Sequence, residues 1–143
     1  MAWTFYNAAK TKIGNGTIDL DTDTFYILLL TNAYTPDIDV DDFRNDIEAN
    51  EVSGTGYTAG GQALTTVTFT QDNANDRAIW DADNPQWTGA TITFRTAVIY
   101  KSNGGASSAD ELVCYNDFGS DQSVTAGTLD ITFDATTGIA TLN

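Results

Sequence analysis

Acidic side chains at regular spacing are the residues of this chain best suited to chemistry. Asp37, Asp39, Asp41, Asn45 and Glu48 fall at the first, third, fifth, ninth and twelfth positions of a calcium-binding loop. Calcium prefers such hard oxygen ligands, so the spacing raises the hypothesis of a calcium site in this segment.

Two features of the same segment weigh against calcium. The sixth position is Asp42, where a helix-loop-helix calcium loop needs glycine for its sharp turn, and Pro36 stands where a helix would have to enter. We therefore expect a solvated acidic loop, in which Asp41 or Asp42 caps a helical turn over residues 43–45. The acidic residues of 19–23 predict only a charged turn before a strand.

The chain lacks the residues of most catalytic sites. It has no histidine and a single cysteine, Cys114, which excludes zinc and iron-sulfur sites and removes the base of Ser-His-Asp and Cys-His catalysis. Carboxylates for glycoside hydrolysis are plentiful, but the sequence marks no pair of them. We expect a protein that is not an enzyme and has no cofactor, with a hydrolase as the last alternative. Cys114 itself, in an apolar run, is predicted to be a buried small hydrophobe.

The composition of the chain argues against two classes of partner. The 143 residues carry a formal net charge of -14, which repels nucleic acid and disfavours anionic membrane surfaces. The longest apolar run, Phe25–Leu30, is far too short for a membrane helix, which needs about 20 residues. No basic and apolar leader opens the chain, which favours synthesis in a reducing cytosol. We expect neither a nucleic-acid partner nor a membrane partner.

Glycine and tryptophan mark two further segments. The glycine-rich residues 54–61 lack the Lys-Ser or Lys-Thr ending of a phosphate-binding loop, so they predict positive φ angles or close backbone approach, with Tyr57 plugging a cleft or contacting a neighbour.

Trp80 and Trp87 flank a short acidic loop. Core packing is expected for Trp80, whereas Trp87 is left open between the core and stacking on a sugar.

An N-terminal helix within residues 1–16 comes first among the elements that must position these residues. Trp3, Tyr6, Lys10 and Ile13 are expected to share one stripe of it, and the glycines that follow would end it.

The rest of the chain has a β pattern. Phe25–Leu30 has no polar face, so it predicts a strand covered on both sides. Two-residue alternation recurs through residues 66–70, 91–101 and 129–133, and shorter apolar runs complete roughly seven or eight strands. We predict one domain over residues 1–143: a mainly β, antiparallel β-sandwich, jelly-roll-like, with a short N-terminal helix. Residues 34–61 are expected to form a long acidic and glycine-rich excursion from it.

Several segments resemble, in the same order, a widespread family of small tailed-bacteriophage proteins. They are Tyr6-Asn7 and residues 16–25, 51–61, 94–100, 117–124 and 134–139. The similarity covers nearly the whole chain, and its most specific part is the Gly-Tyr-Thr-Ala-Gly-Gly element at residues 56–61.

The resemblance implies a virion structural protein, similar to the capsid decoration or cement proteins that have a β-sandwich or jelly-roll fold. It implies no catalytic residue. The expected partners are the major capsid protein and further copies of the chain, by preference in a trimer at local three-fold positions. The expected location is the capsid exterior, after synthesis in the host bacterial cytoplasm. The alternative is a tail-associated receptor-binding or adaptor module that recognises a host glycan or protein.

The contact elements of such a protein would be the segments outside the strand pattern, residues 1–16 and 34–61. Their aromatic side chains are the candidates for buried anchors at a partner surface. These are Trp3, Phe5, Tyr6, Tyr34 and Tyr57.

Overall fold

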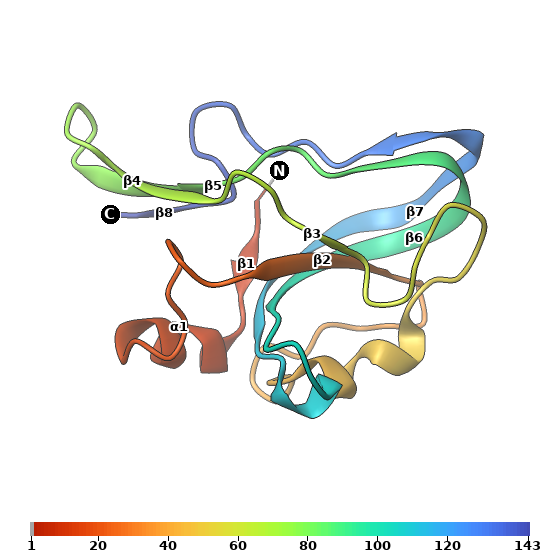
Figure 1. The fold of residues 1–143 in the computed structure, drawn as a ribbon, viewed down its shortest axis with the longest axis horizontal. Helices are drawn as coiled ribbons and strands as arrows, with labels where there is room; N and C mark the ends of the chain where they lie inside the picture. The colour runs from red at the N-terminus through yellow and green to blue at the C-terminus, as the bar shows by residue number, and fades with distance from the viewer. Residues whose placement is uncertain (1) are drawn as a thin grey trace.

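Eight strands and one α-helix make up the fold in a computed structural model that describes residues 2–143 (Figure 1). The strands are β1 (Thr4–Phe5), β2 (Phe25–Leu30), β3 (Gln62–Ala63), β4 (Thr68–Asp72), β5 (Arg77–Asp81), β6 (Gln86–Lys101), β7 (Leu112–Asp130) and β8 (Ala140–Leu142). The helix is α1 (Asn7–Gly14), and short 3-10 turns are η1 (Arg44–Asp46), η2 (Glu48–Asn50) and η3 (Ser107–Ala109). The larger sheet has the order β1-β7-β6-β2-β3 and the smaller one β4-β5-β8, with every pairing antiparallel. The predicted mainly β, two-sheet architecture with a short N-terminal helix is confirmed.

Strand β2 lies in the core, as its sequence predicts. All of its residues except Tyr26 are buried, and it pairs with β6 along its full length. Phe25 meets Trp80 of the smaller sheet edge-on, with ring centroids 5.1 Å apart. Trp80 is fully buried, so the prediction that it packs in the core is confirmed. This contact ties the two sheets together.

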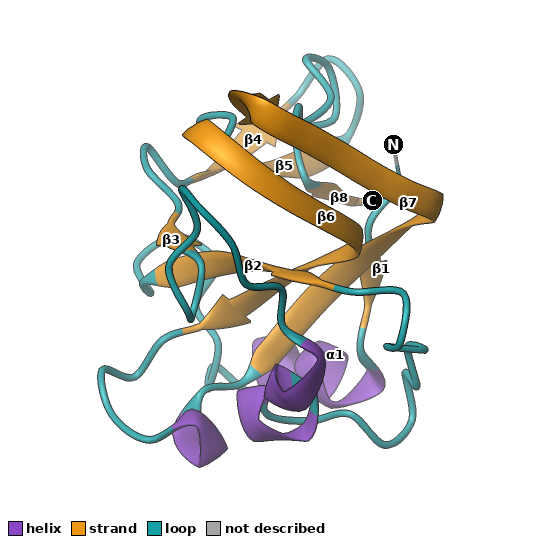
Figure 2. Cartoon of the chain, turned by 90° about the vertical axis from the view of Figure 1, so that its right-hand side faces the viewer, coloured by secondary structure: helices purple, strands orange, loops and turns teal. Residues whose placement is uncertain are grey.

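A long bent hairpin, β6 with β7, forms the largest part of the fold (Figure 2). The sequence predicts a short strand over residues 112–115 and a separate one over residues 129–133, whereas β7 continues from Leu112 to Asp130 with a bulge in which Phe118–Asp121 oppose the single residue Arg95. Gly119 has a φ of +77° in this bulge. The Asp117 carboxylate accepts hydrogen bonds from the Gly119 amide at 2.8 Å and from Arg95 Nε at 3.1 Å. Turn residues therefore bend this strand instead of ending it.

The N-terminal segment differs from the prediction. The helix starts at Asn7, so Trp3 and Tyr6 do not share a helical stripe with Lys10. The residues before it form β1, in which Thr4 faces Tyr115, and the Tyr6 amide donates to the Val113 carbonyl at 3.1 Å. Backbone pairing with the edge of β7 thus replaces the first helical turn. The predicted stop at the following glycines and the burial of Cys114 are confirmed.

The excursion over residues 34–61 is packed along the open edge of β2. The Val52 amide donates to the Leu29 carbonyl at 3.0 Å, and the Thr31 amide donates to the Asn50 carbonyl at 2.9 Å. A helical turn is present, but the predicted cap is wrong. The turn begins at Arg44, and the capping carboxylate is that of Asp46, which accepts the amides of residues 42 and 43 at 3.0 and 2.9 Å.

The glycine-rich residues 54–61 show both features predicted for them. Gly56 and Gly61 have φ angles of +80° and +77°. A Cβ atom at Gly61 would lie on top of the Ile27 carbonyl oxygen, and one at Gly56 would lie 2.8 Å from the Ala90 Cα. The loop therefore needs glycine in order to touch the backbones of β2 and β6.

Gly61→Ala should destabilise the fold strongly, because the new methyl group collides with the backbone of a buried strand. We expect a loss of about 3 kcal/mol or more in the free energy of unfolding, measured by urea denaturation. Gly104→Ala is the matched control, since Gly104 has a φ of +73° and nothing within 4 Å of its Cβ position. The control should lose only the conformational cost of about 1–2 kcal/mol. Equal losses in the two variants would contradict the close approach.

Candidate partner-binding site

The acidic loop is held by hydrogen bonds within the chain. Asp37 accepts the Asp39 amide at 3.1 Å, and Asp41 accepts both the Asp37 amide at 3.0 Å and the Tyr34 hydroxyl at 2.7 Å. The carboxylate of Asp39 accepts the side-chain amide of Asn7. These side chains act as acceptors that shape the turn.

Glu48 is engaged elsewhere. Its carboxylate lies 3.5 Å from Arg44 Nη1 and accepts the Ser107 hydroxyl at 3.0 Å. Within residues 2–143, no three acidic, histidine or cysteine side chains are grouped so that they could hold a metal ion. The structure therefore gives the calcium hypothesis for Asp37, Asp39, Asp41 and Glu48 no support, since their carboxylates accept local backbone and side-chain donors instead of converging on one point.

Two of the five predicted aromatic anchors, Tyr6 and Tyr34, are buried within the chain. Their hydroxyls are 2.8 Å apart, and Tyr34 donates onward to Asp41, which links α1 to the acidic loop. Burial raises the pKa of both phenols well above the ordinary value, and the neighbouring Asp41 charge adds to the rise. Tyr6 has no exposed surface to offer a partner, and the assignment of these two residues as anchors is corrected.

Tyr57 is half-buried and packs against its own chain. Its hydroxyl donates to Glu51 at 2.6 Å and accepts the Leu29 amide at 3.0 Å. Its ring stacks on Trp87, with centroids 6.2 Å apart and an interplanar angle of 24°. Trp87 is 5% exposed, so it does not present a face on which a sugar could stack.

Trp3 and Phe5 are half-buried. The Trp3 ring packs against Phe133 at 5.7 Å between centroids, and the Phe5 ring against Trp80 at 6.3 Å. Of the five predicted anchors, Phe5 is the one that lines the apolar groove described next.

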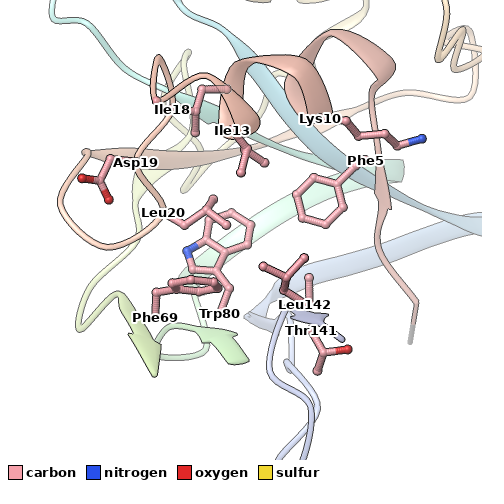
Figure 3. Close-up of a pocket in the computed structure, with 12 residues that line it drawn as sticks. Phe5, Lys10, Ile13, Ile18, Asp19, Leu20, Phe69, Trp80, Thr141 and Leu142 are labelled. Carbon is pink, nitrogen blue, oxygen red and sulfur yellow. The ribbon is translucent and has the colours of Figure 1, made fainter. Parts of the chain in front are cut away.

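An apolar groove of about 580 Å³ lies between the helix and the smaller sheet (Figure 3). Ile13 of α1 and Leu20 of the following turn form one side of it, and Phe69, Trp80 and Leu142 form the other. Its volume falls in the range of sites that bind small molecules or side-chain anchors. The sequence predicts the strands that carry Phe69, Trp80 and Leu142 but not the groove, which forms only where three distant segments meet.

The charged lining residues lie at the sides of the groove. Figure 3 shows Asp19 at one side and Lys10 at the other, with their charged ends directed away from the apolar centre. The Asp21 amide donates to the Asp19 carboxylate at 2.9 Å, and this hydrogen bond lowers the Asp19 pKa. The arrangement suits the binding of an apolar group that carries charges at its ends.

Comparison with known protein families, curated proteins and solved structures found no match. In the part of the chain that the structure describes, no helix has the length and apolar character to cross a membrane.

Tyr57→Phe should destabilise the fold, because it leaves the Leu29 amide and the Glu51 carboxylate without a shared partner. We expect a loss of about 1–3 kcal/mol in the free energy of unfolding, measured by chemical denaturation. Tyr26→Phe serves as the control, since the Tyr26 hydroxyl makes no hydrogen bond within residues 2–143 and should change stability by less than about 0.5 kcal/mol. If the two variants are equally stable, the Tyr57 hydroxyl does not contribute to stability by bonding Leu29 and Glu51.

Alkaline pH should unfold the protein through its tyrosines. Four of the six tyrosines, Tyr6, Tyr34, Tyr57 and Tyr100, have raised pKa values, and burial raises that of Tyr100 to about 12. An unfolded chain releases these protons near pH 10, so the stability that they contribute is complete below about pH 10 and is lost as the pH rises toward 12. Tyrosinate absorbance should therefore rise together with loss of the circular dichroism signal. Reversible ionisation of all six near pH 10 in a folded chain would refute this burial.

Proposed function

We propose that this protein is a structural component of a tailed-bacteriophage virion, and specifically a capsid decoration protein that binds the exterior of the head shell. The family resemblance, which runs in order along nearly the whole chain, supports the virion setting. The expected partner is the major capsid protein, and the expected assembly is a homo-oligomer, by preference a trimer.

The apolar groove between α1 and the smaller sheet is the observation that carries the binding role. It is an open concavity on a scaffold whose loops are hydrogen-bonded to its strands, as where Tyr57 accepts the Leu29 amide of β2 and the Gly60 carbonyl accepts the Tyr100 hydroxyl of β6. A pre-formed concave site with apolar walls is typical of binding proteins. A net charge of -14 supports the same role, since a shell-binding protein must avoid the genome.

Decoration would stabilise the shell by mass action. A protein that binds many equivalent sites of the assembled shell, and not its free subunits, shifts the equilibrium toward the assembled state. Linking copies in an oligomer raises the effective concentration at neighbouring sites.

A tail-associated adaptor is the competing function. Its glycan-binding form depended on an exposed Trp87, and this side chain is packed against Tyr57. Nothing in the described residues favours this function over decoration, and the following experiment separates the two.

Gold-labelled binders against the protein, imaged on intact particles by electron microscopy, test the location. We expect dense labelling over the heads, and particles assembled without the protein provide the background. Heads without the protein should also lose their DNA at a lower temperature. Labels confined to the tail or its tip would overturn the decoration function.

A further inference from the structure

The inner face of the smaller sheet is only partly covered. Trp80 packs against Phe25 and Phe5 from the larger sheet. Beyond it, Phe69 is half-buried and Leu142 is 65% exposed at the edge of the groove (Figure 3). Uncovered apolar side chains that line a concavity mark a place for a partner's side chains.

Lys10 stands out among the cations of the described chain. Four of the six lysines and arginines form ion pairs, and Lys12 lies over the Phe43 ring at 4.0 Å. Lys10 makes no ion pair within residues 2–143 and donates to Asn7 Oδ1 at 2.8 Å. With Asp19 on the opposite side, the groove has one cation and one anion at its two sides.

The size of the groove favours a segment over a folded second copy. Twelve residues line it, whereas a stable protein-protein interface uses about 20–30 residues on each side.

We infer that the groove binds an extended segment of the major capsid protein, with apolar side chains at its centre, a basic side chain facing Asp19 and an acidic one facing Lys10. This inference rests on the proposed function. The apolar side chains would cover Phe69 and Leu142, and the end charges would set the direction in which the segment lies.

Binding to shells that lack the protein, measured by co-sedimentation, tests the groove with three variants. Leu142→Asp places a carboxylate in the groove and should weaken binding about tenfold or more. Lys10→Glu should weaken it about threefold, as expected for an exposed ion pair. Val40→Asp is the matched control, because Val40 is 69% exposed and does not line the groove, and its binding should equal that of the wild type. Both aspartate substitutions lie at exposed positions, and melting curves confirm that each variant is folded.

Cross-linking identifies the occupant. A thiol-directed photo-cross-linker on Leu142→Cys should join the groove to peptides of the major capsid protein, whereas Val40→Cys should not. Cys114 is fully buried, and burial raises its thiol pKa, so it does not compete for the reagent. Cross-links to another copy of the chain would overturn the proposed occupant.

The outcomes separate the two proposals. If the wild type binds shells and Leu142→Asp binds equally well, the groove inference is wrong and the decoration function stands. If the wild type does not bind shells, the decoration function fails, and the proposed occupant fails with it.

Discussion

Strand β2 has no polar face, so each of its backbone N–H and C=O groups must find a partner inside the protein. Strand β6 satisfies one edge. Residues 50–64 satisfy the other edge. The Leu64 amide donates to the Phe25 carbonyl at 2.8 Å, and β3 pairs with β2 at Ile27. The Leu29 amide donates to the Tyr57 hydroxyl. Residues 50–64 therefore act as a clasp on the central strand, and the glycines let their backbone approach closely enough to do so.

Internal contacts of this kind determine which side chains remain available to bind a partner. Tyr57 and the Glu51 carboxylate close the edge of β2, while Tyr6, Tyr34 and Asp41 join the helix to the acidic loop. Aromatic and acidic side chains that could have served a partner or a metal ion thus hold the chain together. The uncovered part of the smaller sheet is left as the apolar concavity, and its two charged side residues give it a direction.

Much of the fold follows from local patterns. Burial of β2, the end of α1 at its glycines, and the close approach of residues 54–61 each depend on a few neighbouring residues, so the sequence predicts them. The length of β7, with its bulge at Phe118–Asp121, and the start of α1 depend on pairing with distant strands, which local patterns do not reveal. The groove could not be predicted for the same reason, because Ile13, Phe69 and Leu142 come together only in the folded chain. The spacing of acidic residues in the loop over residues 37–48 matches a calcium motif. The positions of their carboxylate oxygens, however, are set by the backbone amides that donate hydrogen bonds to them.

Native-state hydrogen exchange of the backbone amides at Leu29, Val52 and Leu64 tests the clasp most directly. If residues 50–64 complete the central sheet, these amides exchange only by global unfolding and show the same protection as Ile99 of β6, which pairs with Ile27. Exchange of these three amides much faster than that of Ile99 would show that the excursion opens while the sheet stays folded. That result would contradict the account and leave residues 34–61 with the role of a contact element outside the sheet.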